Sequence, residues 1–230
     1  QSGFDALPLG MNFEECAQRA EAIGKAATEQ LLKEDIRWNV EPFATTASMS
    51  GSDIMRHLRF SDLVVLQHED GHGAPLRTKE LAEYVLFDAD CPLLLLPTGD
   101  PAKQPADNIM VSWDESPAAL RAARLALPLM RQARVVHIVL VDPPKDAPDR
   151  SDPGGAFAQF LARHGVNCEV SVCSRTDNTI AATLERRAEE LGCDLLVMGA
   201  YGHSRLRQAI FGGTTRAILE HAGIPVLMAH

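Results

Sequence analysis

The stretch that decides the fold reads Asp194-Leu195-Leu196-Val197-Met198-Gly199-Ala200-Tyr201-Gly202-His203 and, further on, Gly212-Gly213-Thr214-Thr215. Its apolar run is too short for a helix and stops at Gly199, which favours a buried strand. The later glycines precede hydroxyl residues that can open a helix. Glycines let backbone amides approach an anion closely, so we expect a strand, a glycine loop suited to phosphate and a helix, in that order.

The rest of the C-terminal half alternates between strand and helix patterns. Strands are expected at residues 108–113, 135–141, 166–174, 194–199 and 225–229, and helices at 117–131, 156–164, 178–191 and 215–221. Pro117 behind Ser116 is typical of a capped helix start. This alternation predicts an α/β fold, with an open parallel sheet flanked by helices and joined by right-handed crossovers.

The N-terminal part carries a shorter succession of elements. Helices are expected at residues 12–32, 48–58 and 77–86, and strands at 35–43, 61–67 and 92–97. Ile36, Trp38 and Val40 alternate strictly with polar residues, which is typical of a half-buried strand. Residues 61–67 hold a short apolar run, so we expect this strand to be buried on both faces.

An internal repeat relates the two parts of the chain. Residues 59–65 match 190–196 in pattern, and residues 89–94 match 222–227. Aligned in this way, the N-terminal part has no counterpart of residues 108–141, which hold a first strand, a first helix and a second strand. Either the N-terminal unit is incomplete, or those residues are left out of the sequence.

The repeat predicts two tandem units. We expect a degenerate or incomplete unit at residues 1–98, a linker at 99–107 and a complete unit at 108–230. The linker is rich in proline and polar residues. Leu93–Leu96 should lie beside Val226–Met228 and form an intrachain pseudo-dimer, and a homodimer stays open.

Composition excludes some classes of function. A net charge of -9 argues against a nucleic-acid binder and against binding to an anionic membrane, because both need a positive face. No apolar stretch approaches the roughly 20 residues that span a bilayer. The five cysteines are odd in number and scattered, so we expect them to be reduced and the protein to be cytoplasmic.

The C-terminal unit resembles the universal stress protein family, and the whole chain resembles a tandem member of it. The most specific feature is the spacing Gly199-x-x-Gly202, nine residues, then Gly212 and a small residue, with Asp114 ending the first strand. The resemblance implies a five-stranded parallel sheet of the adenine nucleotide alpha hydrolase-like kind. It also implies that ATP, with or without Mg²⁺, is a ligand of some members.

The resemblance further implies which residues would hold an adenine nucleotide. They follow the strands or belong to the glycine loop and the helix after it: Asp114, Leu140, Val141, Gly199, Gly202, His203, Gly212, Gly213, Thr214 and Thr215. Asp114 would lie near adenine and ribose, Leu140 and Val141 would border adenine, and the glycines would surround the phosphates and ribose.

One position departs from the family pattern. ATP-binding members usually carry Ser or Thr where this chain has Gly213. The lost hydroxyl could weaken ATP binding tenfold or more, since a charge-assisted hydrogen bond contributes about 1.5 to 3 kcal/mol. Thr214 or Thr215 could supply a hydroxyl instead. The first unit lacks the later glycine pair, so a nucleotide is expected once per chain.

Plainer interpretations of the same residues stay open. The glycines could form tight turns without a ligand, and Asp114 could be a helix cap acting with Ser116. His203 has no evident catalytic partner, and no metal site is expected. No nucleophile elbow and no Walker lysine is visible, which argues against an enzyme beyond slow ATP hydrolysis.

The leading hypothesis is therefore a non-catalytic stress-response regulator that binds an adenine nucleotide and an unidentified protein partner. The alternative is an interaction scaffold of the same fold that binds no nucleotide. A third class, an ATP-dependent ligase of the same wider fold, would need a substrate pocket and an activating group that the sequence does not reveal.

Overall fold

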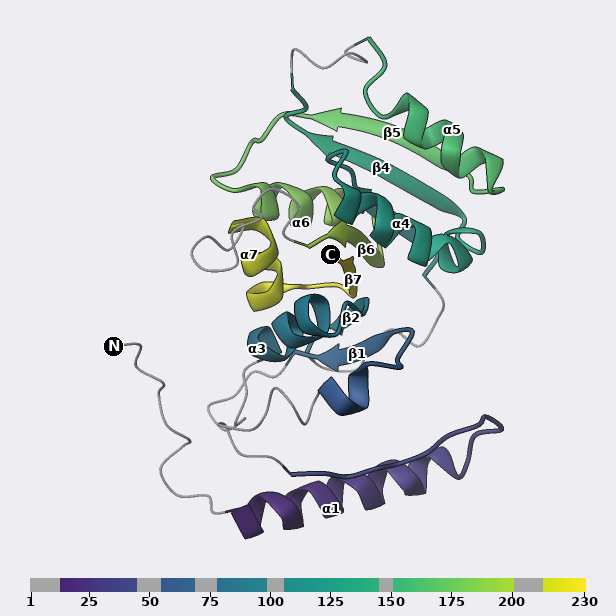
Figure 1. The fold of residues 1–230 in the computed structure, drawn as a ribbon. Coiled ribbons are helices and arrows are strands. Elements are labelled where there is room, and N and C mark those ends of the chain that lie inside the picture. Colours follow the sequence, from purple (N-terminus) through teal and green to yellow (C-terminus); the bar gives the residue numbers. More distant parts are fainter. Residues whose placement is uncertain (1–12, 45–54, 69–77, 99–105, 145–150, 201–212) are drawn as a thin grey trace.

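The computed structural model describes residues 13–44, 55–68, 78–98, 106–144, 151–200 and 213–230 (Figure 1). The N-terminal region holds α1 (Phe13–Leu31), β1 (Val64–Gln67), α3 (Thr78–Glu83), the π-helical turn η1 (Tyr84–Asp88) and β2 (Leu93–Leu96). The C-terminal region holds β3 (Asn108–Ser112), α4 (Pro117–Met130), β4 (Val135–Val141), α5 (Gly155–Arg163), β5 (Cys168–Cys173), α6 (Ile180–Glu190), β6 (Leu195–Gly199), α7 (Gly213–His221) and β7 (Val226–Ala229).

The strands form one mostly parallel sheet of seven, in the order β1-β2-β7-β6-β3-β4-β5. Only the contact between β2 and β7 is antiparallel. The expected count of five was too small, because β1 and β2 extend the sheet beyond β7. The expected pairing at this seam is confirmed, since Leu93 lies opposite Met228 and Leu95 opposite Val226. The division into tandem units stays a prediction.

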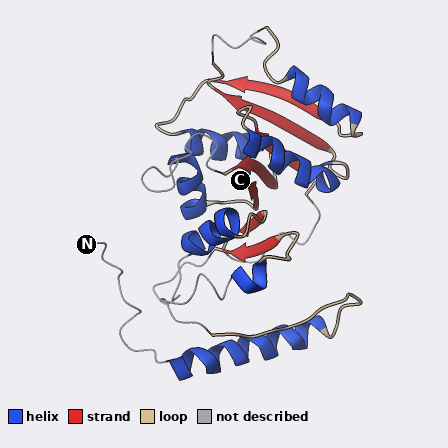
Figure 2. Ribbon diagram, in the orientation of Figure 1, coloured by secondary structure: helices blue, strands red, loops and turns tan. Residues whose placement is uncertain are grey.

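Helices cover both faces of the sheet (Figure 2). One core contains buried residues of α4, α5 and the sheet face beneath them, including Ala122, Ile138 and Leu161. The other contains residues of α6, α7 and the N-terminal region, and Leu86 and Leu93 lie in it. Because this second core contains residues from both parts of the chain, the N-terminal strands are part of the same folded body.

One strand prediction and one burial prediction in the N-terminal region were wrong, whereas the strand expected within residues 61–67 is present as β1. Residues 33–44 form turns and extended chain without a ladder, and Ile36 is 61% exposed. No strand among the described residues lies beside this segment, so its alternating pattern has nothing to pair with. In Figure 1 it runs along α1, and a Cβ atom placed on Gly24 would lie 3.0 Å from Pro42 Cβ. β1 is not buried on both faces, because it is an edge strand and Val65 is 52% exposed.

Candidate functional site

The order of the strands places a topological switch point between β3 and β6. The chain goes from β3 to β4 and β5 on one side and then returns to β6 on the other. The registers pair Ser112 with both Val139 and Met198, so β3, β4 and β6 end at a common carboxyl edge. In open α/β sheets ligands bind outside this edge, at the switch point.

Most predicted site residues that the structure describes lie along this edge. Asp114 follows β3, Val141 ends β4 and Gly199 ends β6. β6 and β7 are parallel, so α7 must return from the carboxyl edge to the amino edge. Its first turn, which begins at Gly213, therefore faces the same edge. Three predicted site residues lie outside the described residues: Gly202, His203 and Gly212.

Asp114 forms a capping arrangement with the start of α4. Its Oδ1 accepts a hydrogen bond from the backbone amide of Ser116 at 3.0 Å. Ser116 Oγ in turn accepts from the amide of Ala119 at 3.0 Å, and Glu115 between them has a positive φ of 61°. The turn therefore holds the carboxylate of Asp114 at the end of β3. This is the capping role that the sequence left open, and it does not by itself require a ligand.

Leu140 and Val141 face opposite sides of β4. Leu140 is only 2% exposed and belongs to the core beneath α4 and α5. A Cβ atom placed on Gly154, which has a φ of 81°, would lie 3.0 Å from Leu140 Cδ1. Val141 is half-buried and contacts the opposite core. Of the two, Val141 offers more surface at the carboxyl edge.

Gly199 has a packing reason for lacking a side chain. A Cβ atom at this position would lie 2.5 Å from the backbone nitrogen of Ala119 and 2.9 Å from the carbonyl carbon of Ala118. Such distances to backbone atoms cannot be relieved by rotating a side chain. Gly199 thus lets the end of β6 lie directly against the first turn of α4, next to the cap that contains Asp114.

Gly213 is different, because a Cβ atom placed there meets no other described part of the chain within 4 Å, apart from its own helix backbone and chain neighbours. It is exposed, Thr214 is half-buried and Thr215 is 3% exposed. The first turn of α7 carries no acidic residue. The amides and the dipole at the start of a helix favour an anion, and no carboxylate within this first turn opposes it.

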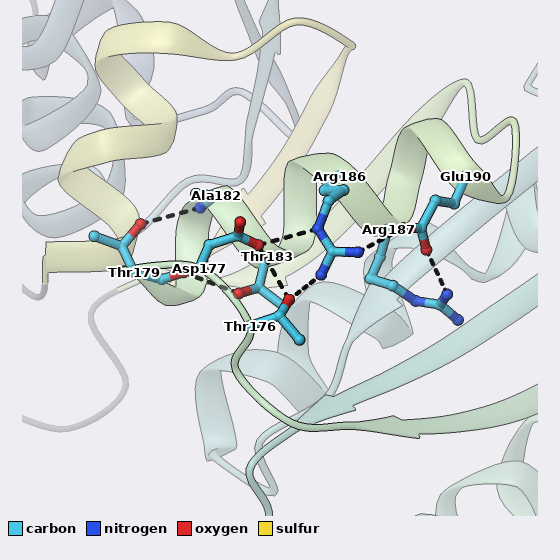
Figure 3. A network of polar contacts seen from close by, with 8 residues as sticks. All are labelled: Thr176, Asp177, Thr179, Ala182, Thr183, Arg186, Arg187 and Glu190. Carbon is cyan, nitrogen blue, oxygen red and sulfur yellow. Dashed lines mark hydrogen bonds and ion pairs between the residues drawn. The ribbon is translucent and has the colours of Figure 1, made fainter.

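A polar network that runs from the loop before α6 to the end of that helix was not found from the sequence (Figure 3). Arg186 binds Asp177 at 3.1 Å and Glu190 at 2.5 Å, and it also donates to Thr176. Glu190 is shared with Arg187, at 2.6 Å. Arg186 and Glu190 are four residues apart, a spacing that could have indicated part of the network.

The network joins the loop after β5 to α6. Arg187 donates to Ser171 on β5 at 2.9 Å, and Thr179 Oγ1 accepts from the amide of Ala182 as the helix cap. The hydrogen bond from Arg186 lowers the pKa of Asp177, and the one from Arg187 lowers the pKa of Glu190. The loop between β5 and α6 is thereby held at the edge of the sheet by charged side chains.

This network should respond to acid. Because the pKa of Asp177 is lower in the folded protein, its contribution is fully present above the ordinary carboxyl pKa of about 3.9 and is lost as the pH falls through the lower folded value. In Arg186→Gln we expect Asp177 to titrate at higher pH, which carboxyl-carbon NMR would measure. Arg216→Gln, which breaks a separate pair with Glu220, is the control. An Asp177 titration that stays unchanged in Arg186→Gln would contradict the assignment.

The structure adds two observations about other kinds of site. Within the described ranges no three His, Cys, Asp or Glu side chains are grouped so that they could hold a metal ion. Over the same part of the chain, no helix combines the length and the apolar character needed to cross a membrane.

Trp113 adds an aromatic contact beside the cap. Its ring stacks on Phe157 with centroids 3.9 Å apart and planes at 3°. Trp113 directly precedes Asp114 and is half-buried, so its fluorescence should report on the carboxyl edge.

The fold and the edge described above define a doubly wound α/β protein with its candidate ligand site at the switch point. A sequence model described as the universal stress protein family matches residues 105–230, which is more than half of the chain. The chain belongs to the universal stress protein family.

Known relatives agree with this membership. Universal stress protein Slr1230 from Synechocystis is 34% identical over 93 residues, which cover 40% of this chain and 31% of that protein. The match thus spans less than a third of that relative's length.

Two solved structures share the fold. A universal stress protein from Archaeoglobus fulgidus DSM 4304 is 18% identical with a TM-score of 0.74, covering 96% of this chain and 81% of that one. A putative universal stress protein from Pseudomonas aeruginosa UCBPP-PA14 is 18% identical with a TM-score of 0.62, covering 91% and 77%.

Proposed function

We propose that this universal stress protein binds one adenine nucleotide, ATP or Mg-ATP, at the carboxyl edge of the sheet and acts as a non-catalytic regulator. One observation carries the proposal. The turn with Asp114, the end of β6 at Gly199 and the first turn of α7 all lie at the carboxyl edge of the sheet, beside the switch point. The glycines between β6 and α7 have the spacing that first suggested a phosphate loop.

The described residues fit such a ligand in chemical terms. The phosphates would lie toward the first turn of α7, where Gly213, Thr214 and Thr215 bring no negative charge. Asp114 would lie on the other side, where its carboxylate can accept hydrogen bonds from ribose or adenine but would repel phosphate. This separation of charge would orient the nucleotide along the edge, with the base toward β3 and β4.

The regulatory role follows from what the site can do chemically. The sequence shows no nucleophile elbow and no Walker lysine, so we expect bound ATP to be hydrolysed slowly at most. Binding would instead change the order of the edge, which a protein partner could sense. The partner, the cytoplasmic location and any homodimer are parts of this proposal that need their own tests.

Titration of the full chain with ATP by calorimetry tests the proposal. We expect saturable binding below about 1 mM ATP, with or without Mg²⁺. The chain has two tryptophans, so Trp38→Phe leaves Trp113 as a single fluorescent reporter beside Asp114. A quench of Trp113 that saturates with the calorimetric signal would place the nucleotide at this edge. A lack of binding at millimolar ATP would reject the proposal.

A matched pair of substitutions at Gly213 sharpens the experiment. Gly213→Ser adds a hydroxyl at a position where a Cβ atom meets none of the other described residues within 4 Å, and Gly213→Ala adds only the Cβ atom. We expect serine to strengthen ATP binding about tenfold, because it restores one charge-assisted hydrogen bond, and alanine to change it little. An equal effect of both residues, measured by the same calorimetry, would show that the hydroxyl makes no such bond.

The scaffold without a nucleotide is the second candidate, and specific observations favour it. Gly199 is explained by its contact with α4, and Asp114 by its cap on the same helix. Neither residue therefore needs a ligand. If the wild-type chain fails to bind ATP and Gly213→Ser gains binding, the scaffold is the better description.

A further inference from the structure

A small group of residues connects the N-terminal region to the point where the chain leaves β6. We call it the seam cluster: Phe87, Asp90, Arg121, Ala200 and His230. Its members come from η1, the turn before β2, α4, the end of β6 and the residue after β7. It therefore lies where β7 meets the N-terminal strands and the first half of α4.

Ala200 is held from two sides at the end of β6. Its amide donates to the carbonyl of Ala229 at 2.8 Å, which continues the parallel ladder by one bond beyond Gly199. Its carbonyl lies 3.0 Å from His230 Nδ1. Because a carbonyl can only accept, Nδ1 carries the hydrogen and donates. Ala200 is completely buried, so these bonds fix the backbone where the glycine loop begins.

Residues of the N-terminal region hold His230 in turn. The ring of Phe87 meets the His230 ring edge-on, with centroids 4.6 Å apart. Asp90, which has a φ of 51°, pairs with Arg121 at 2.8 Å, and its backbone carbonyl also accepts from Arg121 at 3.3 Å. Arg121 then donates to the backbone carbonyl of His230 at 3.1 Å. The His230 ring and backbone are thus both fixed by contacts that involve residues 87–90.

Stability alone does not explain this arrangement. The side chains of Arg121 and Asp90 are 43% and 65% exposed, and exposed ion pairs contribute little to folding. Their contacts do constrain geometry, because one guanidinium binds a carboxylate and two carbonyls. On the other side of the β6 end, Gly199 lies against Ala118 and Ala119 of α4.

We propose that the seam cluster makes residues 87–90 a positioning element for the ligand edge of the C-terminal region. These residues orient His230 and Arg121, and His230 fixes Ala200, so the N-terminal region tunes where the backbone lies at the end of β6. The effect of residues 87–90 on ligand affinity rests on the proposed nucleotide binding. Their effect on the position of the Ala200 backbone does not depend on that proposal.

Hydrogen exchange and ATP titration of the full chain test the two statements separately. His230→Leu removes the hydrogen-bond donor to the carbonyl of Ala200. We expect the amide of Ala200 to exchange with solvent about tenfold faster, a change that corresponds to the loss of one hydrogen bond from this part of the backbone. His230→Asn can keep a donor near the position of Nδ1 and should restore much of the protection. Asp90→Asn should give a smaller increase, about threefold, because it weakens only the pair that holds Arg121.

Arg124→Gln is the matched control for Arg121→Gln. Both substitutions remove a charge from α4, but Arg124 lies over the Phe160 ring, away from the seam. We expect Arg121→Gln and His230→Leu to weaken ATP binding about threefold to tenfold, and Arg124→Gln to leave it unchanged. If His230→Leu fails to fold, Asp90→Asn and Arg121→Gln replace it in both measurements, because these two side chains are exposed.

The outcomes separate the two proposals. If the wild-type chain does not bind ATP, the nucleotide proposal fails, and the exchange of Ala200 still decides whether the seam positions the backbone. Equal Ala200 exchange in the wild type, His230→Leu and Asp90→Asn would overturn the positioning role. Faster exchange with unchanged ATP affinity would overturn its link to the ligand. Equal effects of Arg124→Gln and Arg121→Gln on ATP binding would show that the loss of a charge from α4, and not the seam cluster, causes the change.

Discussion

Replacing Gly199 by alanine is expected to lower the free energy of unfolding by about 3 kcal/mol. The added Cβ atom would lie 2.5 Å from the nitrogen of Ala119 and 3.0 Å from Ala118 Cβ. Since the close atoms include the backbone of α4, the end of β6 and the helix must move apart. Both are central to the fold, so the loss should be near the upper end of what overpacking costs.

Chemical denaturation measures this loss, and a thermal scan should show a melting temperature roughly 6 to 12 °C lower. Gly223→Ala is the control, because a Cβ atom there meets no heavy atom of the described residues within 4 Å, its chain neighbours aside. A change of less than about 0.5 kcal/mol in Gly199→Ala would contradict the close contact. The result also bears on function, because any loss of ATP binding in a Gly199 variant must be separated from a loss of folding.

Replacing Leu93 by alanine should cost about 3 kcal/mol as well. Leu93 is completely buried in the core shared with α6 and α7, and it lies between Val64 of β1 and Met228 of β7. Truncation would leave a cavity at the centre of the seam. Because that core contains side chains from both regions, the loss should appear in one cooperative transition for the whole chain.

Urea denaturation followed by circular dichroism and by tryptophan fluorescence checks this expectation. Val65→Ala, on the exposed face of β1, should cost less than about 1 kcal/mol and serves as the control. Two separate transitions, with only one affected by Leu93→Ala, would show that the N-terminal strands fold apart from the rest.

Local patterns predicted most elements of the C-terminal region well. β4 runs over Val135–Val141 as expected, and the helix start at Pro117 follows the Ser116 cap. In the N-terminal region α1 lies within a residue of its expected bounds. Continuous apolar runs and capping residues act through short-range contacts, so the sequence alone carries them.

The seam was predictable for a different reason. The repeat related the segments before β2 and β7, and two similar edge strands can pair about an approximate two-fold axis. The same comparison did not reveal that β1 and β2 would extend one sheet to seven strands. The number of strands in a sheet depends on whether another strand pairs with its edge strand, and a local sequence pattern does not show this. The unpaired segment with Ile36 and Trp38 shows the same limit, since alternation describes a strand but not its partner.

The sequence predicted where the candidate site lies, but it did not predict the structural roles of the residues there. Gly199 and Asp114 were chosen as ligand residues, and the structure gives each a packing or capping role at the start of α4. A glycine that leaves room for a phosphate cannot be told in a sequence from a glycine that leaves room for a packed helix. The contacts of His230 were missed because its partners, Phe87 and Ala200, are far from it along the chain.

The antiparallel contact of β2 with β7 has a consequence for assembly. An uncovered edge strand invites pairing with other molecules, and here the edge of β7 is already covered by a strand of the same chain. Since both partners are joined covalently, their effective concentration is set by the chain between them and not by the amount of protein in solution. Dilution therefore cannot separate them. Among the described strands, the outer edges of β1 and β5 are the ones left for further copies to pair with.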